Sequence, residues 1–160
     1  MSECGKSSFA EHLRVSHNFL RLKLRYFIEA ILQRGEQATP EAVVLELLSF
    51  LGCHYYVKQI SVESLHDPYI PAMLKLMLGE RMRIVYIDTD VATRTRRAAK
   101  ELGISIADPA VLVERKDEIK RRRGAESVKA IADLVFDNSF DNHEDALRAF
   151  ANQLNLKIGG

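Results

Sequence analysis

The spacing of apolar and polar residues divides the chain into two kinds of segment. In the first kind, apolar and β-branched residues lie close together for a few positions, which is typical of strands. In the second kind, apolar residues recur every three or four positions, which predicts amphipathic helices. The strand-like segments are 21–26, 55–62, 82–87 and 134–136. The helical segments are 9–13, 27–32, 40–51, 68–78, 94–100, 110–123 and 143–154.

Several helix boundaries are marked by residues with a capping or helix-ending role. Thr39 can cap the helix that follows it, and Pro40 suits a first turn because its missing N–H has no partner there in any case. Gly52 and Gly103 are placed to end helices, since glycine readily adopts the left-handed backbone found there. Asn142 is expected to cap the last helix.

The alternation of strands and helices predicts an α/β fold with a parallel sheet covered by helices on both faces. Such sheets bind ligands at the carboxyl ends of their strands. Three polar residues, Glu63, Asp88 and Asn138, follow predicted strand ends. We therefore expect these three side chains to lie near one ligand site.

Length, charge and cysteine content narrow the class of protein. The 160 residues suit a single domain over 1–160. With 23 basic and 22 acidic residues the formal charge is +1, so no global field would draw the chain onto nucleic acid or a membrane. Cys4 and Cys53 form neither a metal-binding spacing nor a disulfide framework. Without a long apolar run or a signal peptide, a cytoplasmic protein with no membrane partner is expected.

The stretch Cys4-Gly5-Lys6-Ser7-Ser8 looks like the second half of a phosphate-binding loop, the Walker A pattern. In such a loop, backbone N–H groups at a helix start hold the phosphates. Lys6 would reach the β- and γ-phosphates, and the Ser7 hydroxyl would bind Mg²⁺. The full pattern has another glycine five positions earlier, with four residues between the two, and that place falls just ahead of Met1. The alternative is a tail without regular structure in which these residues occur by chance.

Glu63 follows an apolar strand, as a carboxylate with a chemical role would. It could hold a metal ion through water or accept a proton from an attacking hydroxyl. Alternatively, Glu63 simply begins a loop, and His66 caps the helix near Asp67.

Basic residues are concentrated in two predicted helices. Arg94 and Arg97 lie three apart on one helix face, and Arg115 begins a basic stretch that runs to Arg123. Arginines that close over a nucleotide stabilise the charge on the transferred phosphoryl group, and for Arg97 and Arg115 we favour this role. The alternative for each residue is a solvated helix face.

The order of these features resembles the P-loop nucleoside and nucleotide kinase family, nearest to its dephospho-coenzyme A kinase and deoxynucleoside monophosphate kinase branches. Three pieces carry the resemblance. They are Gly5-Lys6-Ser7-Ser8 ahead of the first helix, the strand 84–88 leading into a helix with Arg94 and Arg97, and the segment 132–139, which is similar to the family's "Ala-Asp-x-Val-x-x-Asn" ending.

The resemblance implies an ATP-dependent phosphotransferase with a three-layer P-loop NTPase-like sheet and a helical lid over about 104–124. It implies that Cys4 and residues 5–8 bind the phosphates of ATP and Mg²⁺, and that Asn138 lies near the adenine. Catalytic roles would fall to Lys6, Glu63, Arg97 and Arg115. The acceptor, a small metabolite such as a nucleoside, a nucleotide or dephospho-coenzyme A, would contact residues 22–26 and 63–66.

The chain departs from this family at its amino end. The family has a buried central strand before the loop, for which this chain has no residues, so we expect a sheet without its first strand and a start at an internal Met. The family's acidic residue after the second strand has no counterpart. Arg21, Lys23 and Arg25 stand there instead, which suggests an anionic acceptor.

Two function classes stay open at this point. The first is the small-molecule kinase, and the second is a catalytically silent or regulatory protein that binds ATP through the same loop. A nucleic-acid reader built on residues 121–123 is a third, more distant alternative, and the near-zero net charge counts against it. The pattern assigns neither an oligomeric state nor a general base.

Overall fold

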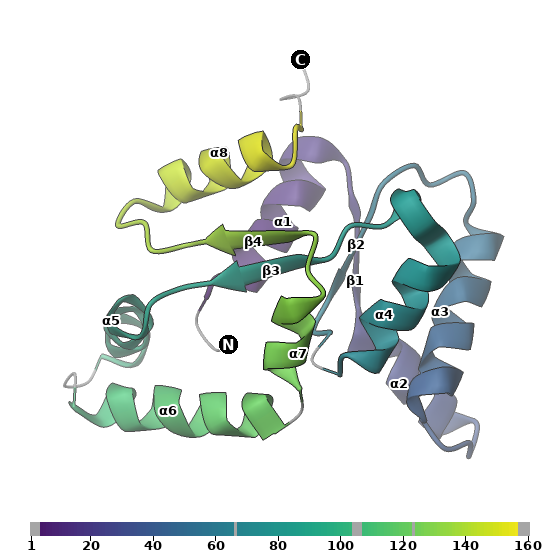
Figure 1. Cartoon of the computed structure of the whole chain (residues 1–160), viewed down its shortest axis with the longest axis horizontal. Helices are drawn as coiled ribbons and strands as arrows, with labels where there is room; N and C mark the ends of the chain where they lie inside the picture. Colours follow the sequence, from purple (N-terminus) through teal and green to yellow (C-terminus); the bar gives the residue numbers. More distant parts are fainter. Residues whose placement is uncertain (1–3, 66, 104–106, 123, 157–160) are drawn as a thin grey trace.

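The strands of the computed structural model form two separate parallel pairs (Figure 1). In the first pair β1 (Leu20–Lys23) lies beside β2 (Ile60–Glu63), and in the second pair β3 (Val85–Asp88) lies beside β4 (Leu134–Asp137). Within the part of the chain that the structure describes, no ladder joins β2 to β3. The described residues are 4–65, 67–103, 107–122 and 124–156.

The first pair packs against three helices through an aliphatic core. These are α2 (Leu24–Gln33), α3 (Pro40–Cys53) and α4 (Tyr69–Leu78), and the short 3₁₀ helix η1 (Gly79–Arg81) follows α4. Helical spacing places the apolar side chains of each helix on the buried side. The buried core residues are Leu22, Leu24, Phe27, Ile31, Val43, Val44, Leu47, Ile70 and Leu74.

The second pair packs against α8 (His143–Gln153) and against α1 (Lys6–His17), which also contacts β1 and β2 of the first pair. Its core is aromatic, because the rings of Phe9, Phe136 and Phe150 pack against one another from α1, β4 and α8. The Phe9 and Phe136 ring centroids lie 5.3 Å apart in an edge-to-face arrangement, which the ring quadrupoles favour.

Three further helices follow β3 and precede β4. They are α5 (Val91–Leu102), α6 (Ala107–Arg122) and α7 (Ala125–Ala130). α5 and α6 pack side by side (Figure 1) and are joined by an ion pair between Arg94 and Asp117, both of which are buried. Arg94 also donates to the Thr89 carbonyl at 3.0 Å, so the buried charge has more than one partner.

The expected three-layer P-loop NTPase-like sheet with a helical lid is wrong. The described chain is mostly helical, and its strands are four residues long and hydrogen-bonded only in pairs. Of the expected lid over about 104–124, residues 104–106 and 123 lie outside the described residues. Residues 107–122 form α6, which the buried Arg94–Asp117 pair fixes against α5.

Three predicted strands were placed over too many residues, and the third of them, 82–87, is a strand only from Val85. The alternating pattern of 21–26 gives a strand only to Lys23, and α2 begins at Leu24 because Leu24, Phe27 and Ile31 share its buried face. The aromatic start of 55–62 is not a strand, and Tyr55 is 86% exposed there. Aromatic residues favour strands mainly when they pack against neighbouring apolar side chains, and the exposed Tyr55 does not do so.

The predicted caps are mostly confirmed. The Ala42 N–H donates to the Thr39 hydroxyl oxygen at 3.2 Å, and the Glu144 N–H donates to the Asn142 side-chain oxygen at 2.9 Å. Gly103 ends α5 in the left-handed conformation. Gly52 was expected to end its helix, which is wrong, because α3 continues through Cys53.

Candidate functional site

The candidate site is the amino terminus of α1. Gly5 caps the helix with φ 83° and ψ 8°, a left-handed conformation that favours glycine, and no side chain caps the helix start. A Cβ at Gly5 would lie 2.8 Å from Nδ2 of Asn138, so the position also lacks space for a larger residue. The first N–H groups of a helix have no partner within it, and Ser7 and Ser8 beside them are exposed. The short loop and helix start predicted from Gly5-Lys6-Ser7 are therefore confirmed.

Asn138 holds this loop in place from the end of β4. Its Nδ2 donates to the Cys4 carbonyl at 3.0 Å, and its backbone N–H donates to the Asp88 carbonyl at 2.8 Å. Cys4 and Asn138 are both buried. The Oδ1 atom of Asn138 is buried without a hydrogen-bond partner among the described residues. The structure thus brings together Cys4, Gly5 and Asn138, three of the residues singled out from the sequence.

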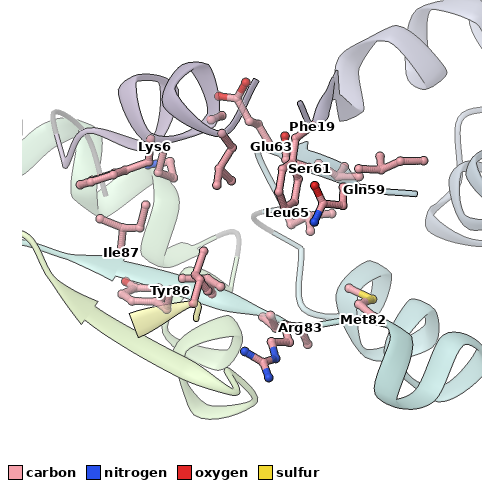
Figure 2. A pocket seen from close by; sticks show the side chains of 18 of the residues that line it. Lys6, Phe19, Gln59, Ser61, Glu63, Leu65, Met82, Arg83, Tyr86 and Ile87 are labelled. Atoms are coloured by element: carbon pink, nitrogen blue, oxygen red, sulfur yellow. The ribbon is translucent and has the colours of Figure 1, made fainter. Parts of the chain in front are cut away.

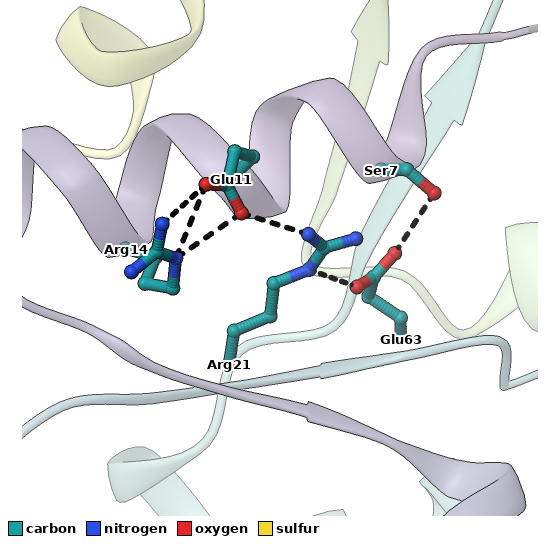
Figure 3. A network of polar contacts seen from close by, with 5 residues as sticks. All are labelled: Ser7, Glu11, Arg14, Arg21 and Glu63. Atoms are coloured by element: carbon teal, nitrogen blue, oxygen red, sulfur yellow. Dashed lines mark hydrogen bonds and ion pairs between the residues drawn. The ribbon is translucent and has the colours of Figure 1, made fainter.

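Glu63 meets the exposed first turn of α1 through Ser7. The Ser7 hydroxyl donates to Oε2 of Glu63 at 3.2 Å, although the two residues lie 56 positions apart (Figure 3). Glu63 is buried and also forms an ion pair with Arg21 of β1. The structure thus places Glu63 in contact with the first turn of α1, and its charge is already balanced by a guanidinium.

Arg21 connects Glu63 to a second carboxylate that the sequence reasoning missed. Arg21 lies 2.8 Å from Glu11, and Glu11 also pairs with Arg14 on the same helix at 2.5 Å (Figure 3). The hydrogen bond from Arg14, assisted by Arg21, lowers the pKa of Glu11 to about 2. The hydrogen bond to Glu63 raises the pKa of Arg21. A line of alternating charges thus runs along α1 up to Ser7.

Lys6 turns toward the start of its own loop. Its Nζ donates to Sγ of Cys4 at 3.2 Å. Phosphate oxygens are much stronger acceptors for an ammonium group than a thiol. The Lys6 side chain would therefore gain by moving to an anion at the helix start.

Asp88, at the end of β3, is held in an ion pair. Lys129 of α7 donates to Oδ2 of Asp88 at 2.5 Å, and the Thr89 N–H donates to Oδ1 at 3.0 Å. Burial raises the pKa of Asp88, but these hydrogen bonds outweigh it and leave that pKa below its usual value. Asp88 is ionised and engaged at neutral pH.

The two arginines favoured from the sequence have different surroundings. Arg97 donates to the carbonyls of Asn138 at 2.9 Å and Phe140 at 3.0 Å, so it supports the segment that holds Cys4. Arg115 is exposed on α6 and makes no hydrogen bond or ion pair with the loop among the described residues. The structure thus brings Arg97 but not Arg115 into contact with the candidate site.

The donor set for a metal ion is small. Ser7 and Glu63 supply two adjacent oxygens, which fit Mg²⁺ because it binds few protein groups and keeps several waters. No cluster of three or more His, Cys, Asp or Glu side chains suited to a metal occurs in the described ranges. His66 lies outside the described residues.

A cavity of about 460 Å³ lies beside the site, between β2 and β3 (Figure 2). Lys6 and Glu63 line its end near α1, and apolar residues of α1 and α8 line much of the rest. We call this cavity the inter-pair slot.

The comparisons with known proteins show a fold and no family. No family model and no curated protein matches the chain. It is similar to a solved structure described as "Crystal structure of uncharacterized protein from Eubacterium ventriosum ATCC 27560", with a TM-score of 0.62 and 12% identity over 97% of this chain and 94% of that one. At this identity the likeness concerns the fold alone, so membership of the kinase family stays a prediction.

No helix in the described part of the chain is both long enough and apolar enough to cross a bilayer.

Proposed function

We propose that this protein binds the phosphates of ATP, with Mg²⁺, at the amino terminus of α1 and transfers the γ-phosphoryl group to a small metabolite in the cytoplasm. The observation that carries the proposal is the helix start itself. It begins at a left-handed Gly5, has no side-chain cap, and places Lys6 and Ser7 in its first turn. Unpaired N–H groups and the positive end of the helix dipole attract phosphate oxygens.

Ser7 and Glu63 are the residues that would hold the metal ion. The Ser7 hydroxyl and the Glu63 carboxylate are in contact at the exposed end of the first turn. Bound Mg²⁺ would neutralise charge on the phosphate oxygens. The chain's own contribution is to orient these two oxygens, and Arg21 fixes the carboxylate from the other side.

Lys6 and Arg97 would act on charge in different ways. Lys6 would leave the Cys4 sulfur and place its ammonium on the phosphates. Arg97 keeps the loop in position through the Asn138 carbonyl and is a positioning residue in this structure. Arg115 would contribute only if α6 approached the loop.

The second candidate function is ATP binding without turnover. It is favoured by one specific observation: Arg21 forms an ion pair with Glu63. A carboxylate oxygen that is engaged by a guanidinium is not available to contact the hydroxyl of an acceptor. Such a protein would respond to ATP through Lys6 and Ser7 without transferring phosphate.

Titration calorimetry with MgATP tests the shared part of both candidates. The unmodified chain is expected to bind MgATP saturably, and Lys6→Ala is expected to weaken binding by about tenfold or more, since it removes a charge-assisted contact. Lys100→Ala, an exposed lysine on α5, is the matched control and should bind as the unmodified chain does. No saturable binding to the unmodified chain would contradict the proposal.

Transfer of a labelled γ-phosphate to a panel of acceptors then separates the two candidates. Label on an acceptor, lost in Lys6→Ala, supports the phosphotransferase. Binding of MgATP with no label on any acceptor supports the silent ATP-binding protein.

A further inference from the structure

The inter-pair slot is bounded by the edges of two strands. Residues 58–65 and 80–87 line it without interruption, so successive residues of β2 and β3 all contribute. A sheet face would be lined by alternate residues, because side chains of a strand point to opposite faces in turn. The slot therefore lies between the backbones of β2 and β3, whose residues line it from two sides (Figure 2).

Both edges are open. In the described chain, β2 is hydrogen-bonded to β1 alone and β3 to β4 alone. Each strand thus presents one row of backbone donors and acceptors toward the slot. An open edge of this kind is a template for pairing with another strand.

Two side-chain hydroxyls at the slot also lack partners. Oγ of Ser61 in β2 and the hydroxyl of Tyr86 in β3 are buried and have no hydrogen-bond partner among the described residues, and both residues line the slot (Figure 2). A buried polar group without a partner destabilises a protein by about 1–3 kcal/mol. An occupant that carries donors and acceptors could satisfy these groups, whereas a purely apolar occupant could not.

The other walls of the slot are apolar. Phe9 and Leu13 line it from α1, Val128 lines it from α7, and Phe150 and Leu154 line it from α8 and its end. These walls select apolar side chains on an occupant whose backbone remains polar. An extended peptide combines the two properties.

The entrance to the slot carries an excess of positive charge. Lys58 precedes β2, and Arg81 and Arg83 precede β3; all three are exposed, and the nearby acidic residues are Glu80 and Asp133, of which Asp133 interacts with Arg83 and also pairs with Lys75. At the opposite end, Glu63 lies against α1. The charge distribution therefore fits a peptide with acidic residues at the end that lies near Lys58 and Arg83.

We infer that the inter-pair slot binds one extended segment of a partner polypeptide, about four apolar residues long with an acidic flank, as a strand between β2 and β3. The bound strand hydrogen-bonds to both open edges, and its acidic flank lies beside Lys58 and Arg83. The length follows from the four residues in each strand. This inference does not rest on the proposed function, because the open strand edges, the two buried hydroxyls and the basic flank involve neither Lys6 nor Ser7, although Glu63 both lines the slot and belongs to the proposed metal site.

Fluorescence anisotropy with a labelled peptide, Asp-Glu-Ile-Val-Ile-Val-Gly, tests the inference on the full chain. Saturable binding is expected. A peptide with the same side chains but N-methylated at alternate residues should bind at least about tenfold more weakly, because it cannot donate to one of the edges. Equal binding of the two peptides, or no saturable binding of the first, would overturn the inference.

Variants of the chain locate the peptide. Lys58→Glu should weaken binding several-fold at low salt, and Lys100→Glu is the control with the same charge change on exposed α5. The pair Ser61→Ala and Tyr86→Phe should weaken binding without lowering the free energy of unfolding. Unchanged affinity in all of these variants would place the peptide elsewhere and overturn the inference.

Competition separates the partner strand from other occupants. Decanoate, which has an apolar chain and no amide groups, should not displace the peptide at equal concentration. Displacement by decanoate would show a lipid-like site. Binding only when the same strand is fused ahead of Met1, or dimers of the chain that exclude the peptide, would show a different source of the strand. Each of these three results would overturn the inference.

Discussion

Both strand pairs are parallel, but different hydrophobic cores stabilise them. The first pair is covered by three helices and an aliphatic core, whereas the second depends on three phenylalanine rings from α1, β4 and α8. The helix α1 contacts both pairs, and neither pair completes the edge that faces the slot. The contrast shows that local helix packing can stabilise a two-stranded sheet while its other edge stays open.

The largest expected difference between the pairs concerns the aromatic core. Phe136→Ala should lower the free energy of unfolding by about 3–5 kcal/mol, because the ring is 1% exposed and packs on both Phe9 and Phe150. Leu47→Ala in the first pair should cost about 2–5 kcal/mol. Urea unfolding measures both.

The control for Phe136→Ala is Val135→Ala, because Val135 is the neighbouring residue of β4 and is 45% exposed. Its effect should be much smaller. If Leu47→Ala lowers the free energy of unfolding more than Phe136→Ala does, the contacts between the aromatic rings add no stability beyond the apolar area that they bury.

Glycines in the two halves provide the next comparison. Gly5 and Gly35 both have a left-handed backbone, with φ 83° and φ 76°. A Cβ would meet Asn138 at Gly5 but no atom within 4 Å at Gly35. Gly35→Ala should cost about 1 kcal/mol from backbone strain alone, and Gly5→Ala more, about 2–3 kcal/mol. Equal losses in urea unfolding would mean that Asn138 moves aside freely.

The ion pairs that join α1 to the first pair should produce a pH dependence. The folded-state pKa of Glu11 is about 2, below its ordinary value of 4.5, so its contribution to stability is complete above pH 4.5 and is lost as the pH falls toward 2. Glu11→Gln should flatten the stability profile in this window. Glu29→Gln, an exposed glutamate of α2 without an ion pair among the described residues, should leave the profile unchanged.

Local features of this fold could be read from the sequence. Gly5 as a helix start and Thr39 and Asn142 as caps were predicted correctly, because each depends on hydrogen bonds within a few residues. The four strands were placed in the right regions, but β1, β2 and β3 proved shorter than expected.

Contacts between residues that are distant in the chain could not be predicted from the sequence. Whether the two strand pairs belong to one sheet depends on residues that are distant in the chain, and the expected three-layer sheet without its first strand was wrong for this reason. The contact between Arg21 and Glu63 spans 42 positions, and Glu11 joins it from the preceding helix. The only local signal was the polar position of Arg21 in an alternating strand, which does not indicate a partner.

The smallest expected effect is at Tyr86, and it tests the open edge of the second pair. The Tyr86 hydroxyl is buried and has no hydrogen-bond partner among the described residues, so Tyr86→Phe should change the free energy of unfolding by no more than about 0.5 kcal/mol near pH 7, or raise it slightly. A loss above 1 kcal/mol would show that the hydroxyl already has a partner in solution.

Alkaline titration should make the same group visible. Burial, assisted by nearby acidic groups, raises the pKa of Tyr86 to about 12 from 10.0. The neutral phenol is favoured in the folded state, so its contribution to stability is complete below pH 10 and is lost as the pH rises toward 12. Tyr86→Phe should remove this alkaline loss, and Tyr56→Phe, at a side chain that is 67% exposed, should not. Ultraviolet absorbance follows the ionisation of the tyrosines. If Tyr86 ionises over the same pH range as Tyr56, water reaches the Tyr86 hydroxyl in the slot and burial does not raise its pKa.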